Sequence, residues 1–194
     1  LIRLIDPETA TETNRQYLGI AKTFRALIYM DISRFFEYKK TGIAKLDNEA
    51  EANKIYGLTV PIIYENITER VPFYTMYEYI LKDLDDAEEY LKDYTRPTKN
   101  MPDQTIIYGL KARLWLEMGT RFEKYPNDLS ALTQNVDLGV NSAKDCYAKA
   151  AEYARKVISN SGAQPLSESE WFGGKNYTAG FNTIQTGAWL WGSI

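Results

Sequence analysis

The clearest hydrophobic pattern in this chain lies between residues 73 and 119, which read as two helices joined by a short connection. Six apolar residues of the first helix follow one another in steps of four and three, so they lie on one helical face: Phe73, Tyr77, Ile80, Leu84, Ala87 and Leu91. The second helix, from about residue 104, has so few polar positions that we expect it to be mostly buried. Pro97 and Pro102 keep the connection out of helix. The stretch therefore predicts a helical hairpin that packs against other hairpins.

The ends of these two helices carry sequence signals. Thr75 and Glu78 have the spacing of a capping box, in which each side chain bonds a backbone N–H of the first turn. Gly119 is expected to end the second helix in the left-handed conformation. Gly109 stands in the middle of the second helix, where glycine costs about 1 kcal/mol relative to alanine, and so it indicates a close approach by another helix.

An amphipathic helix is predicted near the start of the chain, over residues 12–37. Its expected buried face consists of Leu18, Ala21, Phe24, Ile28, Ile32 and Phe35. Arg25 is expected to pack its aliphatic stem while its charged head reaches water. Asp31 has the spacing to pair with Arg34 one turn later.

A fourth helix is predicted to follow Ser142, which caps it, and to end near residue 160. Its inner face holds small and aromatic residues: Ala143, Tyr147, Ala150, Ala154 and Val157. Beyond it, residues 163–194 show no helical period and read as loop with short strands.

Two long connections separate these helices, at about 38–72 and 120–141. Structureless connections of more than about 12–15 residues are uncommon in compact domains. Within the first connection, residues 47–55 read as a short polar helix, and 58–64 as an extended segment that Pro61 restricts to an edge position. The second connection is expected to fold partly back on the helices through its aromatic residues.

The overall prediction is an all-α fold of helical hairpins with long, aromatic-rich loops. The four helices form two successive pairs, an arrangement similar to tetratricopeptide (TPR) hairpins, although the long connections depart from a 34-residue period. We interpret residues 1–160 as one TPR-like helical region. Residues 161–194 then form the irregular, Gly- and Trp-rich start of a following region that is truncated here.

Composition excludes several kinds of active site. The chain contains no His and a single Cys, so it cannot form a His-based catalytic triad, a His metal site or a Cys-rich zinc site. A net charge of −3 does not indicate a nucleic-acid partner. Five acidic residues between 83 and 89 are interpreted as a solvated helix face rather than a calcium site. We therefore predict no catalytic residue, no metal and no cofactor.

Five segments, in order along residues 15–160, resemble the SusD/RagB family. They are AKTFRALIYMDISRFF at 21–36, VPII at 60–63, ILKDLDDA at 80–87, IYGLKARLWL at 107–116 and the helix from Tyr147 to Ile158. The chain departs from the family pattern at Glu37-Tyr38 and in the 120–141 connection. Family chains are also longer, so we expect this chain to be part of a larger protein, with the lipidated N-terminus outside it.

The resemblance implies a surface-exposed, lipid-anchored protein of the bacterial outer membrane. Such a protein covers a SusC-like TonB-dependent transporter and captures an oligo- or polysaccharide, or another nutrient, for uptake. It contacts the membrane only through its lipid anchor and is not an enzyme.

Candidate ligand contacts lie between residues 171 and 191, where aromatic faces alternate with amides. Sugar recognition uses flat aromatic surfaces for the C–H face of the ring and polar groups for the hydroxyls. The candidates are Trp171, Asn176, Tyr177, Phe181 and Trp189. Trp189 also fits a role as a cover over the helices, and for Trp171 and Tyr177 the two interpretations stay open.

Two other functions remain open from the sequence alone. The first is a TPR-type scaffold for protein–protein interaction, which has no need of long aromatic loops. The second is an all-α glycoside hydrolase, for which the sequence offers many carboxylates but does not show their separation.

Overall fold

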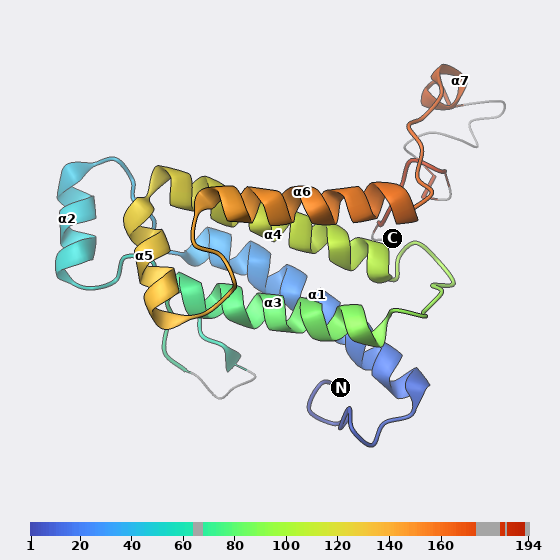
Figure 1. The fold of residues 1–194 in the computed structure, drawn as a ribbon, viewed down its shortest axis with the longest axis horizontal. Helices are drawn as coiled ribbons and strands as arrows, with labels where there is room; N and C mark the ends of the chain where they lie inside the picture. The colour runs from blue at the N-terminus through green and yellow to red at the C-terminus, as the bar shows by residue number, and fades with distance from the viewer. Residues whose placement is uncertain (64–67, 174–182, 185, 193–194) are drawn as a thin grey trace.

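A computed structural model describes residues 1–63, 68–173, 183–184 and 186–192, and its regular structure there is helical (Figure 1). Four long helices form two layers. Helix α1 (Glu12–Phe36) packs along α3 (Phe73–Tyr90), and α4 (Gln104–Lys124) packs along α6 (Ala143–Asn160). Smaller contacts of α4 with α3 and α1 join the two layers. This arrangement confirms the predicted all-α fold of paired helices.

Three shorter helices occupy the ends of the bundle. Helices α2 (Ala44–Ala52) and α5 (Pro126–Asn135) lie at the end where α4 finishes, whereas α7 (Glu168–Trp171) projects from the opposite end (Figure 1). Helix α2 corresponds to the short polar helix expected in the first long connection. After it, Leu58 and Pro72 form an isolated antiparallel bridge, which confirms extended backbone at the start of the predicted 58–64 segment. Ile63 lies in a short helical turn, and Tyr64 falls outside the described residues.

The core lies between the four long helices and is almost entirely apolar. Its fully buried residues come mostly from α3 and α4, among them Met76, Ile80, Leu84, Ile107, Leu114 and Met118. The predicted burial of both helices of the central hairpin is therefore confirmed. Within the described residues, none of the helices has the length and apolar content that crossing a membrane requires.

The buried face of α1 differs from the predicted one. Phe24, Ile28 and Phe35 are 37%, 52% and 83% exposed. The helix instead turns a stripe of mostly small residues inward: Gly19, Thr23, Ala26, Met30 and Ser33. A methyl group placed on Gly19 would lie 2.9 Å from Leu91 Cγ, so small residues allow α1 to approach its neighbour closely.

The polar residues of α1 also help to explain why its buried face differs from the predicted one. Arg25 does not reach water, because its guanidinium donates to both carboxylate oxygens of Asp83 at 2.6 and 2.7 Å. Asp83 is 2% exposed and also accepts from Lys22 at 3.1 Å. The acidic run on α3 is therefore not a uniformly solvated face, since Asp83 is buried and Asp85 pairs with Lys111 of α4 at 2.6 Å.

Two of the predicted helix ends are wrong. Helix α3 begins at Phe73, directly after Pro72, and has no side-chain cap, so Thr75 and Glu78 do not form a capping box. Gly119 does not end α4, which continues to Lys124 because Phe122, one turn beyond, packs into the core. Gly119 is helical and meets the ring of Tyr147, where an added methyl group would lie 2.6 Å from the ring.

The close approach predicted at Gly109 is therefore found at Gly119 instead. At Gly109 an added methyl group would lie 3.9 Å from Val157 Cγ2, an ordinary contact. The second long connection also proves shorter than predicted, because α4 extends into it and α5 fills most of the rest. The cap of α6 is confirmed, since Ser142 Oγ accepts from the backbone N–H of Asp145.

Candidate functional site

The predicted aromatic region at the C-terminal end is described only in part. Trp171 lies on α7 and is 59% exposed, as a ligand platform requires, and Trp189 is half-buried. Asn176, Tyr177 and Phe181 fall outside the described residues. The structure therefore places two of the five candidates and leaves the platform itself a prediction.

Residues 186–192 cover one end of the bundle. Trp191 donates its indole N–H to the backbone oxygen of Asn100 at 3.0 Å, and its ring centre lies 5.5 Å from that of Phe24. Lys99 Nζ donates to the backbone oxygen of Thr186 at 2.5 Å. These contacts favour the covering role for this segment, so Trp171 is the more accessible of the two described candidates.

A second candidate site lies at the opposite end of the bundle, between α1, α4, α2 and α5. It consists of two adjoining hollows of about 500 and 810 Å³. Both are lined by Lys40, Tyr56, Lys124 and Tyr125, so they form one continuous groove. We call it the basic groove and define it by seven residues: Lys39, Lys40, Lys54, Tyr56, Arg113, Lys124 and Tyr125.

The floor of the basic groove is a buried ionic network around Arg121. Its side chain is 9% exposed and donates to Glu37 Oε1 at 2.6 Å and to Asp128 Oδ2 at 2.7 Å. Tyr56 donates its hydroxyl proton to the same Asp128 oxygen at 2.9 Å. The guanidinium also lies 3.6 Å from the ring centre of Phe73. This network joins α4, α5 and the 38–72 segment, and so it holds the groove open in a defined shape.

Electrostatics keep these groups in one protonation state. Burial lowers the pKa of Arg121, but nearby Tyr77, Glu37 and Asp128 raise it by more, so the net pKa lies above the ordinary value. Burial and the negative charge of Asp128 raise the pKa of Tyr56. Tyr56 therefore remains a neutral hydrogen-bond donor at all physiological pH values.

The rim of the basic groove combines cations with tyrosine rings. Lys40 Nζ lies 5.4 Å from the ring centre of Tyr56, and Lys124 Nζ lies 5.2 Å from that of Tyr125. Burial raises the pKa of Tyr77, whose ring lines the inner part of the first hollow. Aromatic faces beside hydrogen-bond donors can hold a polar ring by stacking and by hydrogen bonds to its hydroxyls.

Sequence reasoning missed this groove because its residues stand in segments predicted to be loops or helix ends. Arg121 and Glu37 are 84 residues apart, and Tyr56 and Asp128 are 72 apart. One signal was present: long connections in a compact domain are often functional, and the 38–72 connection contributes Lys39, Lys40 and Tyr56.

Over the part of the chain that the structure describes, His, Cys, Asp and Glu side chains form no group of three or more that could hold a metal ion. The single thiol, Cys146, is buried, and burial raises its pKa to about 11. A thiol in that state is a weak nucleophile at neutral pH.

The fold is similar to that of a solved SusD-like carbohydrate-binding protein from Bacteroides vulgatus ATCC 8482. The two superpose with a TM-score of 0.61 at 18% sequence identity, over 95% of this chain and 31% of that one. No protein-family model matches the sequence, and no curated protein matches it. At this identity the likeness concerns the fold, and it confirms the predicted SusD-like helical scaffold. The chain spans about a third of the length of the protein it resembles.

Proposed function

We propose that this chain is the helical part of a carbohydrate-binding protein that takes up glycans at the cell surface. Two observations support the proposal together: the SusD-like fold, and a groove whose walls present tyrosine rings and hydrogen-bond donors. The bound glycan stacks on Tyr125 and Tyr56, where the two hollows join. The exposed Trp171 on α7 is a second candidate contact at the other end of the bundle, and Asn176, Tyr177 and Phe181 stay candidates from the sequence alone.

The wider proposal follows the resemblance. The full-length protein is lipid-anchored at the outer membrane and delivers its glycan to a SusC-like TonB-dependent transporter. It binds the glycan without cleaving it, as the resemblance to SusD-like proteins implies. Release of reducing sugar from a bound glycan, lost on mutation of one carboxylate, would contradict a purely binding role.

The test is a titration of the protein with a panel of neutral and acidic oligosaccharides, followed by calorimetry. Tyr125→Ala removes a ring from the groove, and Trp171→Ala removes the ring on α7. Tyr17→Ala is the matched control, since Tyr17 is 54% exposed on α1 but does not line the groove.

We expect at least one glycan to bind with a Kd that Tyr125→Ala raises about tenfold, as the loss of one stacking ring does. Tyr17→Ala should leave that Kd unchanged. An effect of Trp171→Ala alone would assign the site to the C-terminal region instead. Absence of binding to every glycan of the panel would count against carbohydrate recognition by this chain.

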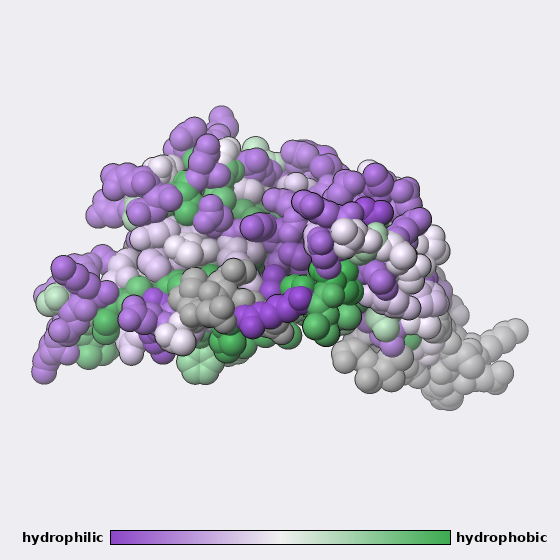
Figure 2. All heavy atoms as spheres, turned by 90° about the horizontal axis from the view of Figure 1, so that it is seen from below, coloured by the Kyte–Doolittle hydropathy of each residue, from purple (hydrophilic) through white to green (hydrophobic). Residues whose placement is uncertain are grey.

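One observation favours the second function, a TPR-type interaction scaffold. Helix α1 exposes Ile28 and Phe35, and Ile28 lines an apolar hollow of about 670 Å³ together with Phe24 and Ile63. Figure 2 shows hydrophobic residues in several separate groups on the face of the molecule seen from below. A competition assay separates the functions, because a scaffold binds a peptide or protein and ignores polysaccharide.

A further inference from the structure

The charge around the basic groove is opposite in sign to that of the whole chain. The chain carries a net charge of −3. Besides the buried Arg121, six cationic side chains line the two hollows: Arg34, Lys39, Lys40, Lys54, Arg113 and Lys124. The carboxylates that line them are three, namely Glu51, Glu117 and Asp128. Positive charge is therefore concentrated where the hollows open.

Ion pairs neutralise part of this positive charge. Arg113 pairs with Asp31 at 2.8 Å, and Arg34 pairs with Glu117. Lys40 pairs with Glu51 at 2.9 Å. The hydrogen bond to this carboxylate raises the pKa of Lys40. These three cations are compensated and serve mainly to shape the rim.

Three lysines remain available for a ligand. Lys39 is 46% exposed and lies 3.6 Å from Glu37, a carboxylate that Arg121 already binds at 2.6 Å. Lys54 and Lys124 take part in none of the ion pairs found over the described part of the chain. Lys124 instead lies beside the ring of Tyr125, a residue that lines both hollows. Cations with spare charge thus stand next to the aromatic faces proposed to hold a sugar.

We propose that the basic groove binds a glycan that carries carboxylate or sulfate groups, with the sugar rings on Tyr125 and Tyr56 and the anionic groups at Lys124, Lys54 and Lys39. This inference rests on the proposed glycan-binding function and specifies its ligand class. Low-dielectric walls on either side of the groove concentrate the field of these lysines and favour an anionic ligand over a neutral one of the same shape.

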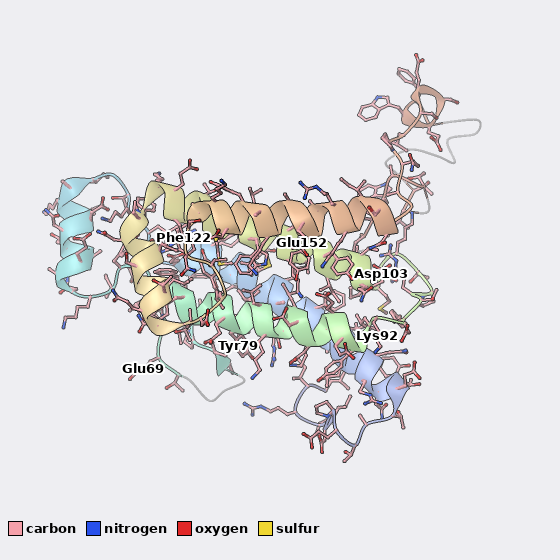
Figure 3. All side chains as sticks on the ribbon, viewed as in Figure 1. Glu69, Tyr79, Lys92, Asp103, Phe122 and Glu152 are labelled. Carbon is pink, nitrogen blue, oxygen red and sulfur yellow. The ribbon has the colours of Figure 1, made fainter. Side chains whose placement is uncertain are left out.

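The test compares glycans that differ only in charge. Oligogalacturonate is paired with its methyl ester, and κ-carrageenan oligosaccharides, whose only charged groups are sulfates, with their neutral desulfated form. Inorganic sulfate is titrated alone as a probe without a sugar ring. The double variant Lys54→Gln/Lys124→Gln removes two charges from the groove. Lys92→Gln is the matched control, because Lys92 lies at the opposite end of the bundle (Figure 3).

We expect one charged oligosaccharide to bind about tenfold or more tightly than its neutral partner, with an affinity that falls as salt rises. The double variant should weaken that binding about five- to tenfold, the effect of two exposed charge contacts, and leave the neutral partner within twofold. Lys92→Gln should change neither. Which pair responds distinguishes a carboxylate from a sulfate ligand.

Two other outcomes overturn the inference in different ways. Equal affinity for charged and neutral partners, with binding still lost in Tyr125→Ala, would remove the preference for anions and leave the glycan function standing. Binding of inorganic sulfate with no binding of any oligosaccharide, charged or neutral, would contradict the glycan function itself, and this inference with it.

Discussion

At the scale of single residues, the buried charges of this bundle are paired between helices. Asp83 of α3 is the clearest case, because Arg25 and Lys22 of α1 both donate to it. Taking an ion out of water costs several kcal/mol, and the pair recovers this only when its geometry is good. A bidentate guanidinium–carboxylate contact has that geometry. The pair therefore selects one rotation of α1 rather than adding stability in general.

Removing the carboxylate of Asp83 should show how strongly the stability of the fold depends on its pair with Arg25. Asp83→Asn keeps the shape of the side chain but leaves the Arg25 guanidinium, 9% exposed, without its counter-charge. We expect a loss of about 3 kcal/mol in the free energy of unfolding, measured by urea titration. Asp93→Asn, a matched change on the exposed surface, should stay within about 0.5 kcal/mol. Equal small effects of both variants would contradict a specific role for the pair.

Lys111 predicts a pH dependence. Burial lowers the pKa of this lysine, but hydrogen bonds from its ammonium to Asp85 and Glu88 raise it by more, so the folded-state pKa lies above the ordinary 10.5. Such a group contributes stability that is fully present below the unfolded pKa and is lost as pH rises through the folded value.

The variant Lys111→Met tests this contribution. It also removes a charge that lowers the pKa of the neighbouring Tyr108, so the ionisation of the tyrosines is followed in both proteins by ultraviolet absorbance. We expect the unfolding free energy of the wild type, relative to that of the variant, to be constant below about pH 10 and to fall above it. A difference that stays constant from pH 7 to pH 12 would show that the lysine contributes no linked proton.

At the scale of elements, the C-terminal half of α4 supplies residues of both the core and the ionic network under the basic groove. It continues past Gly119, packs Phe122 into the core and delivers Arg121 to Glu37 and Asp128. Figure 3 shows Phe122 near α5, at the end of the bundle that holds the basic groove. A helix that stopped at Gly119 would have left no groove.

The two glycines of α4 should respond oppositely to the same substitution. Gly119→Ala places a methyl group 2.6 Å from the ring of Tyr147, whose hydroxyl donates to Glu123 at 2.6 Å, so the ring must move. We expect a loss of about 1–3 kcal/mol in unfolding free energy. Gly109→Ala, with its nearest contact at 3.9 Å, should gain about 0.5–1 kcal/mol through helix propensity.

Thermal unfolding followed by circular dichroism measures both changes. A gain in stability for Gly119→Ala would show that α6 can shift without cost, and would contradict the close packing of α4 on α6. A loss for Gly109→Ala would indicate a tight contact at that position after all.

At the scale of the whole molecule, most of the described core comes from the four long helices, and the connections and α5 add Ile62, Val71, Leu132 and Val140. Residues 186–192 pack on one end of this core. Leu190 and Trp191 are half-buried against that core. A chain ending at Gly162 keeps every long helix. We expect this shortened chain to unfold in one cooperative transition. Its free energy of unfolding should be about 1–3 kcal/mol lower than that of the full chain, because roughly two apolar contacts are lost.

Urea unfolding of the truncated chain, with the helical signal and the fluorescence of Trp115 as probes, tests this expectation. Coincident transitions would establish that the helical region folds on its own. A broad transition that differs between the two probes would show that residues beyond 162 complete the core.

Comparison of the sequence with the structure shows which patterns are decisive. The four long helices and the pairing of first with second and third with fourth follow from apolar spacing, because a helix with one apolar face must bury it. The capping box at Thr75 was wrong because Pro72 already stops the chain from being helical one residue before Phe73. The predicted buried face of α1 was wrong because the prediction followed the spacing of the large apolar residues, whereas the helix buries mostly small ones.

Of the candidate sites, the sequence named Trp171 as a possible ligand contact without deciding its exposure, and it gave no indication of the basic groove. The groove depends on Glu37, Tyr56, Arg121 and Asp128, which come from the end of α1, the 38–72 connection, α4 and α5 and meet only after folding. Charged and aromatic residues at such positions read individually as surface residues. No local period links them.

The sequence by itself determined the all-α class, the four long helices and the absence of histidine or cysteine chemistry, because propensity, periodicity and composition are local properties. Only the tertiary structure decided which face of α1 is buried, where helices approach most closely and where cations surround tyrosine rings. Each of these is a relation between residues far apart in the chain, set by the close packing of one helix on another and by the cost of leaving a buried charge unpaired.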